Sequence, residues 1–204
     1  MKSTDNSRGP QSRDEEMSAD TVALQSTVTK FAGPSCEVNL PDTFVVDPTF
    51  LEQYSTFDIL NNNNKVAVVE RNGTNTNSRF ALKDVTNGKI MGTAVYNHPS
   101  SKIPVFNCDN YLIGSIQAIR KTNEIKAVDR DGKIQFVGHI EDQDASVFNF
   151  KNSDGKDVFS MHRIQENGRE LWRVEVHHMA GVDGRYVLFF VTYKSFLNDL
   201  KSSK

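Results

Sequence analysis

The sequence predicts a mainly β protein: a closed antiparallel β-barrel of about twelve strands around one hydrophobic helix near the C-terminus. Two observations lead to this prediction. Short apolar segments separated by Asn- and Gly-containing turns recur along the chain, and one long apolar stretch, Asp183 to Leu200, comes last. Many antiparallel strands in series leave two unpaired edges, which closure into a barrel removes. The barrel interior then needs filling, and the stretch from Asp183 is the only candidate.

That stretch reads as a helix buried on most sides. Tyr186 to Val191 is apolar without a break, and apolar residues continue at steps of three and four as far as Leu200. A strand over Tyr186 to Tyr193 stays open as an alternative, because β-branched and aromatic residues favour strands. A bilayer span is not expected, since it takes roughly 20 mostly apolar residues.

Length and composition predict one domain with a tail. The chain has 204 residues and a formal net charge of −2. Residues 1–35 are polar and predict a disordered tail, so the barrel domain should occupy residues 36–204. Because the chain is not basic, we expect no nucleic-acid partner.

The first elements after the tail are short. Thr43 to Val46 is predicted as a strand that Asp47-Pro48 ends, because the residue before a proline is pushed away from helical angles. A short helix is predicted at Phe50 to Tyr54.

A hairpin pattern then occurs four times. Phe57 to Asn61 leads through an Asn-rich turn into Val66 to Glu70. Three further copies span Phe80–Met91, Ile125–Ile134 and Phe148–Lys156, with Asn-Gly or Asp-Gly at the turn. The last copy matches the first in the spacing of its Phe, Asn and Lys residues, which indicates an internal duplication. Further strands are predicted at Tyr111–Ile119, Phe136–Ile140, Val158–Ile164 and Leu171–Val176.

The two cysteines, Cys36 and Cys108, lie far apart and form no C-x-x-C motif. This spacing signals neither a disulfide framework nor a zinc site, so we expect two free buried thiols. The N-terminus is polar and has no apolar signal-peptide region, which predicts a reducing, cytoplasmic setting.

Three segments together resemble the tubby C-terminal-like superfamily. They are Phe57 to Glu70, Arg79 to Gly88, and Trp172 to Asp183, which leads into the helix. The last segment is most similar to LURP-one-related proteins, and phospholipid scramblases are more distant members. The resemblance covers roughly residues 44–200 and implies a twelve-stranded barrel around a central hydrophobic helix. The chain lacks the cysteine cluster and acidic calcium segment of the scramblases, so calcium-activated scrambling is not expected.

Motifs for catalysis or metal binding are not found. Asp129 to Gly132 has carboxylates at alternate positions, but the register of a calcium loop fails and a hairpin turn fits better. His177-His178 would point two imidazoles in opposite directions on a strand, and His139 or His162 could join one of them only through tertiary proximity. We therefore expect a non-catalytic protein without metal or cofactor.

Basic residues provide the candidate phosphate site. These are the pair Arg120-Lys121, the nearby Lys126, and Arg79, which with Arg71 flanks an Asn-rich loop. If the pair lies at a strand end, these donors can converge on an anion at one barrel rim.

The resemblance implies a module that binds anionic phospholipid or phosphoinositide, cytoplasmic and peripheral at a membrane. The alternative is a protein-interaction or scaffold domain of the LURP-one-related kind, with protein partners and no lipid role.

Overall fold

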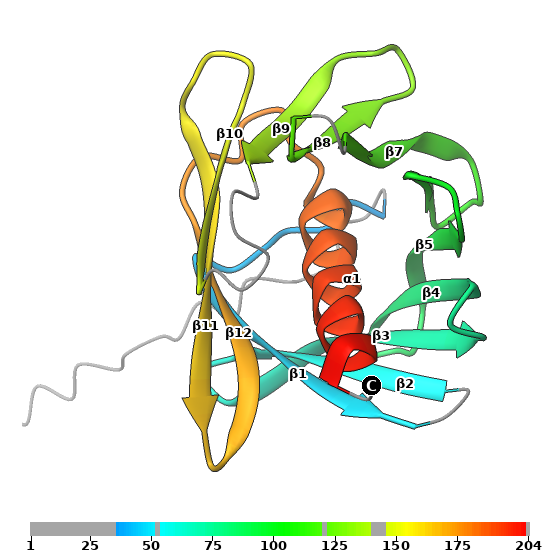
Figure 1. The fold of residues 1–204 in the computed structure, drawn as a ribbon, viewed down its shortest axis with the longest axis vertical. Helices are drawn as coiled ribbons and strands as arrows, with labels where there is room; N and C mark the ends of the chain where they lie inside the picture. Colours follow the sequence, from blue (N-terminus) through cyan, green and yellow to red (C-terminus); the bar gives the residue numbers. More distant parts are fainter. Residues whose placement is uncertain (1–35, 52–53, 120–121, 140–145, 203–204) are drawn as a thin grey trace, which may run out of the picture.

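The computed structural model describes residues 36–51, 54–119, 122–139 and 146–202, with side chains described as far as Leu197. Twelve antiparallel strands close into a barrel around one helix, α1 (Gly184–Ser202), as the sequence predicts (Figure 1). The predicted tail, residues 1–35, lies outside the described residues. In the described part of the chain, no helix is long and apolar enough to cross a membrane.

The strands follow one another around the barrel, and the first pairs with the last to close it. Their bounds are β1 (Thr43–Phe50), β2 (Tyr54–Asn61), β3 (Asn64–Gly73), β4 (Asn77–Asp84), β5 (Ile90–Asn97), β6 (Lys102–Asn107), β7 (Leu112–Ile119), β8 (Glu124–Asp129), β9 (Ile134–His139), β10 (Val147–Lys151), β11 (Asp157–Glu166) and β12 (Arg169–Val176).

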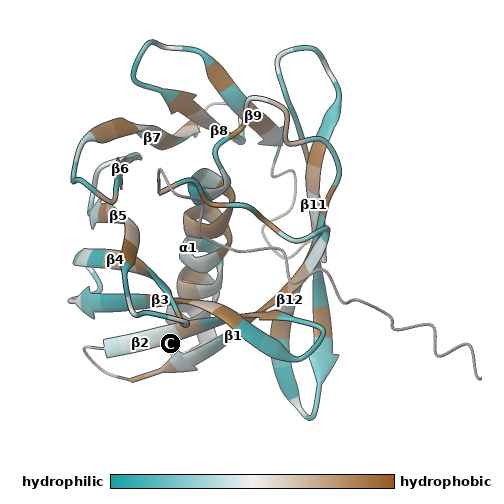
Figure 2. Cartoon of the chain, turned by 180° about the vertical axis from the view of Figure 1, so that it is seen from behind, coloured by the Kyte–Doolittle hydropathy of each residue, from teal (hydrophilic) through white to brown (hydrophobic). Residues whose placement is uncertain are grey.

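Helix α1 fills the barrel. Tyr186 to Val191 lies within this helix, so the strand alternative for this segment is wrong, and every side chain from Tyr186 to Val191 is buried. In Figure 2 the helix lies at the centre of the ring of strands and carries brown, apolar stretches between paler ones. Thr192 and Ser195 are also buried, and their hydroxyl groups donate to the carbonyl oxygens of Leu188 and Val191. Bonding to the preceding turn satisfies these hydroxyls without an outside partner.

All four predicted hairpins form. In the first, Asn62 and Asn63 both have positive φ, 48° and 63°, which is the conformation that a tight two-residue hairpin turn needs. Gly88, Gly132 and Gly155 supply the positive φ in the other three turns. The internal duplication itself stays a prediction.

Strand β1 continues through Asp47-Pro48, so its predicted end was wrong. Pro48 pairs with Phe57 of β2, whereas the ladder to β12 ends at Val46. The Pro48 carbonyl oxygen accepts a 2.7 Å hydrogen bond from Arg169 on the β12 side. The missing N–H of Pro48 therefore faces the place where no ladder bond is required.

Two further predictions fail for local reasons. No helix occupies Phe50 to Tyr54 in the described residues: Phe50 ends β1 opposite Ser55, and Tyr54 opens β2 opposite Asn72. Strand β6, which has Pro104 in its middle, was not predicted. Pro104 is tolerated because the ladder from β6 to β5 stops at Val105, one residue before it would need the proline N–H.

The cysteines are not free. Cys36 and Cys108 form a disulfide with Cα atoms 6.1 Å apart, across a sequence separation of 72 residues. Cys36 comes from the segment ahead of β1 and Cys108 from the loop between β6 and β7, so only the fold brings them together, which the sequence spacing could not indicate. Because disulfides are rare in reducing compartments, cysteine usage no longer supports the cytoplasmic prediction.

Candidate functional site

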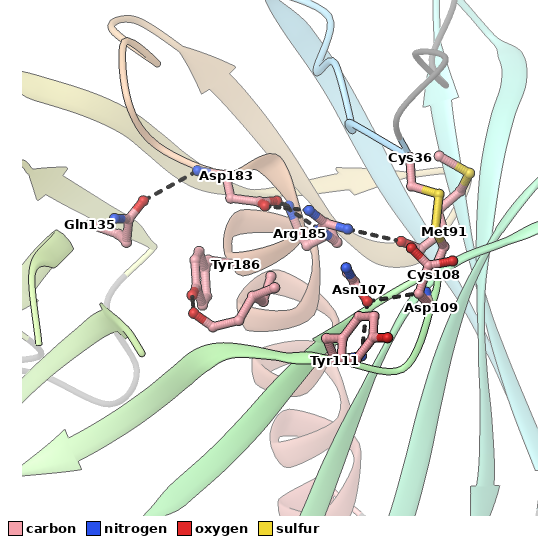
Figure 3. A network of polar contacts seen from close by, with 11 residues as sticks. Cys36, Met91, Asn107, Cys108, Asp109, Tyr111, Gln135, Asp183, Arg185 and Tyr186 are labelled. Carbon is pink, nitrogen blue, oxygen red and sulfur yellow. Dashed lines mark hydrogen bonds and ion pairs between the residues drawn. A yellow bond between two sulfur atoms is a disulfide. The ribbon is translucent and has the colours of Figure 1, made fainter. Parts of the chain in front are cut away.

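The end of the barrel at the start of α1 is closed by a polar network (Figure 3). Asp183 caps the helix, because its carboxylate accepts the backbone N–H of Arg185 at 3.0 Å and also the Arg185 guanidinium. Arg185 reaches on to the Met91 carbonyl oxygen, and the Asp183 N–H donates to Gln135. Burial raises the pKa of Tyr186, and the nearby carboxylates of Asp183 and Asp129 raise it further. These groups satisfy one another, so this network positions the helix.

The predicted phosphate residues occupy different parts of the barrel wall. Arg120 and Lys121 lie outside the described residues, between the end of β7 at Ile119 and the start of β8. Lys126 is partly buried on β8, and Arg79 is exposed on β4. Strands β5, β6 and β7 lie between them, which is about 20 Å along the sheet. Arg79 and Lys126 therefore do not converge on one anion.

Arg71 is not a surface residue, contrary to its predicted place beside an exposed loop. Its side chain is 2% exposed, and it donates to Ser78 Oγ at 3.1 Å and to Ser55 Oγ at 3.2 Å. The guanidinium carbon lies 4.2 Å from the centre of the Phe196 ring of α1. Arg71 therefore joins the barrel wall to the helix and is unavailable to a ligand.

A groove of about 590 Å³ lies on the outer face of strands β6 to β8. The inward-facing residues of these strands, such as Ile103 and Ile116, are in the core, so the residues between them point outward. The groove is lined, among others, by Lys102 and Pro104 of β6, Ser115 and Gln117 of β7, Val128 of β8, and Arg130 of the β8–β9 turn.

A basic row runs across three strands beside this groove, and two of its members, Lys102 and Gln117, line the groove. Lys102, Gln117 and Lys126 are direct cross-strand partners on β6, β7 and β8, and all three point outward. Among the described residues, neither lysine takes part in an ion pair. Gln117 donates to Ser115 Oγ at 3.0 Å and has a second amide N–H to offer. Two ammonium groups around an amide donor can hold a phosphate. Lys102 was not predicted, because only the strand pairing places it beside Lys126.

Exposed apolar side chains also adjoin the groove. Tyr111 is 71% exposed and Leu112, which lines the groove, is 48% exposed. Arg130 lies close by, since its N–H donates to the carbonyl oxygen of Ile113. A tyrosine and a leucine next to cationic side chains are typical of surfaces that rest on a membrane interface.

The turn at Asp129 is a hairpin turn, as predicted. The Asp129 carboxylate accepts N–H groups from Asp131 and Lys133 at 3.0 and 2.9 Å, and its second oxygen accepts the Gln135 amide. Both carboxylate oxygens of Asp129 therefore accept hydrogen bonds from protein groups, as expected for a hairpin turn.

Two of the histidines do meet. Ser160 Oγ lies 3.2 Å from Nε2 of His162 and 3.2 Å from Nε2 of His177, a proximity that the sequence could not show. Glu175 is 3.9 Å from the same nitrogen of His162. In a serine–histidine–acid relay the acid binds the other ring nitrogen, so this cluster is not such a relay. His139 is not part of it, because it lies on β9 opposite Glu124.

Comparisons of the chain with models of known protein families, with curated proteins and with solved structures found no match.

Proposed function

We propose that this protein binds the phosphate headgroup of anionic phospholipids through the basic row of Lys102, Gln117 and Lys126. The row is the observation that supports the proposal most directly: two lysines and an amide donor on adjacent strands, of which Lys102 and Gln117 line the groove. The sequence predicts the pair Arg120-Lys121 as part of the same phosphate site, although both residues lie outside the described part of the chain. Several cations are needed, because each contributes only about 1 kcal/mol near an anionic surface.

The exposed Tyr111 and Leu112 support a membrane surface over a free phosphate compound. Apolar side chains gain free energy by entering the interface, whereas a soluble anion offers them nothing. We also propose, from the resemblance of its sequence and from its architecture, that the chain is a member of the tubby C-terminal-like superfamily. The resemblance implies a twelve-stranded barrel around a hydrophobic helix and a role at phospholipids, and the architecture has this form.

Vesicle flotation tests the proposal. The full chain should float with vesicles that contain anionic phospholipid and stay behind with neutral phosphatidylcholine vesicles. Binding should be stronger at low than at physiological salt, because the Debye length falls to about 8 Å at 0.15 M. The double variant Arg120→Ala, Lys121→Ala should bind several-fold more weakly with an unchanged melting temperature.

Absence of any anionic-lipid-dependent flotation at low salt would contradict the proposal. It would favour the alternative, a protein-interaction domain of the LURP-one-related kind. Equal flotation with neutral and anionic vesicles would also contradict it, because the apolar residues alone would then account for binding.

A further inference from the structure

Three potential metal ligands meet beside the start of α1. Within the described part of the chain, Cys36, Cys108 and Asp109 form the only set of three or more His, Cys, Asp or Glu residues whose ligand atoms all lie within 4.8 Å of one another. Figure 3 shows the three side chains together, with Cys36 coming from the segment ahead of β1 and the other two from the β6–β7 loop.

The loop holds Cys108 and Asp109 in a fixed turn. The side-chain oxygen of Asn107 accepts the N–H of Asp109 at 3.0 Å and the N–H of Tyr111 at 2.9 Å, and the backbone closes through Asn110. On the other side, Cys36 is buried and belongs to the core cluster with Val38. Hydrogen bonds within the loop therefore position Cys108 and Asp109, and burial in the core holds Cys36.

Two thiolates and a carboxylate are ligands that Zn²⁺ accepts. The sulfur atoms of a disulfide are not, so the bridged form and a metal-bound form exclude each other. We propose that the reduced chain binds one Zn²⁺ through the sulfur atoms of Cys36 and Cys108 and the carboxylate of Asp109, with solvent at the fourth position.

The exchange between the two forms balances. A small-molecule dithiol gives two electrons and two protons to the disulfide, becomes a cyclic disulfide itself, and leaves two protein thiols. Zn²⁺ then displaces both thiol protons as it binds. In the reverse direction, a small-molecule disulfide takes up two electrons from the thiolates, the protein disulfide re-forms, and the metal ion is released.

The geometry allows this exchange with small movements. Zinc–sulfur bonds of about 2.3 Å in a tetrahedral site hold two sulfur atoms about 3.8 Å apart. The Cα atoms are 6.1 Å apart, so rotation of the two side chains can open the sulfur atoms to this distance. Cys36 is buried, Cys108 is half-buried and Asp109 is exposed, which leaves one side open to metal and reductant.

The disulfide form and the zinc form would both connect the segment ahead of β1 to the β6–β7 loop. The chain after Cys36 packs on the start of α1, where an added Cβ at Gly184 would lie 2.7 Å from the carbonyl oxygen of Val38. The disulfide or the metal would each anchor this segment to the β6–β7 loop. The site would thus keep the start of the helix covered in oxidising and in reducing surroundings.

Zinc titration of the full chain tests the proposal, with a chromogenic chelator as competitor. The fully reduced protein should bind one Zn²⁺ per chain, and the disulfide form should bind none at this site. Co²⁺ in place of Zn²⁺ should give a thiolate-to-metal charge-transfer absorption with the reduced protein alone. Zn²⁺ should also raise the melting temperature of the reduced chain, because it binds the folded state.

Variants assign the ligands. Cys36→Ser and Cys108→Ser should each abolish the charge-transfer absorption. Asp109→Asn keeps both thiols and should weaken zinc binding about tenfold or more. Asp154→Asn, at an exposed aspartate in the β10–β11 turn, is the matched control and should change nothing. If a cysteine variant fails to fold, the zinc affinity of Asp109→Asn still tests whether Asp109 is a ligand.

Three results would overturn the proposal. They are the lack of stoichiometric zinc binding by the reduced chain, equal binding by the reduced and disulfide forms, and an affinity that Asp109→Asn leaves unchanged.

Discussion

The hydroxyl group of Tyr186, in the first turn of α1, donates a 2.8 Å hydrogen bond to the carbonyl oxygen of Ile113 in β7. This bond joins the enclosed helix to the barrel wall at the end that the Asp183–Arg185 network closes (Figure 3). The residue after Ile113 is Gly114, which lets the tyrosine ring approach this closely. A Cβ added there would collide with the Tyr186 hydroxyl and with the carbonyl oxygen of Val128.

Tyr186→Phe should lower the free energy of unfolding by about 1 kcal/mol, because it removes one hydrogen bond of a buried hydroxyl group, while the Ile113 carbonyl oxygen still accepts the N–H of Arg130. Urea denaturation at neutral pH measures this change. Tyr111→Phe removes a hydroxyl from a mostly exposed ring and should leave the stability unchanged. Equal stability of Tyr186→Phe and the unsubstituted chain would show that the bond contributes nothing.

The pKa of Tyr186 is raised in the folded chain, chiefly by burial. A phenol whose pKa is higher folded than unfolded contributes stability that is complete below the unfolded value, about 10, and is lost as the pH rises towards the folded value. The unsubstituted chain should therefore lose more stability than Tyr186→Phe between about pH 9 and 11. Parallel loss in both proteins would contradict the assignment to Tyr186.

Gly114→Ala should destabilise the barrel by about 2 kcal/mol or more, because the added methyl group meets backbone atoms that cannot move aside cheaply. The matched control is Gly155→Asn. It places a larger side chain in open space, at a φ of +76° that asparagine tolerates. Thermal unfolding of both variants checks this, and a Gly114→Ala protein as stable as Gly155→Asn would contradict the close approach.

Phe190→Asp should prevent folding. The ring is 1% exposed and its centre lies 4.9 Å from that of Phe150, so the variant would bury an unpaired carboxylate. This costs several kcal/mol against a total stability of roughly 5–15 kcal/mol. Phe190→Leu should stay folded and lose about 1–2 kcal/mol. A soluble Phe190→Asp protein that melts cooperatively would contradict the central position of the helix, as would the same result for Phe189→Asp.

The sequence predicted those parts of the fold that local patterns determine. Asn and Gly residues marked the hairpin turns, such as those at Asn62 and Gly132, where the backbone has positive φ, and the turns gave the number of strands. The apolar segment that begins at Tyr186 had to be buried, and this gave the position of the helix inside the barrel. Predictions from local sequence were wrong where the pairing with a neighbouring strand determines whether a proline is tolerated. Pro48 and Pro104 both look like strand breakers, but each lies beyond the end of a ladder on one side.

The candidate site was harder to predict, because strand pairing creates it. Lys102 and Lys126 are 24 positions apart and become neighbours only across Gln117. Arg71 looks like any surface arginine until the two serine hydroxyls and the Phe196 ring close around it. For the same reason, the pairing of Cys36 with Cys108 had no signal in the sequence.

The most direct test of the account is the affinity of the double variant Lys102→Ala, Lys126→Ala for anionic vesicles at low salt. Its matched control is Lys89→Ala, Lys156→Ala, which removes the same charge from two exposed hairpin positions outside the groove. If the basic row binds the headgroup, the first variant should bind at least about tenfold more weakly, which corresponds to about 1.4 kcal/mol, and the control should bind like the unsubstituted chain. Equal affinity of the two double variants would contradict headgroup binding at the row.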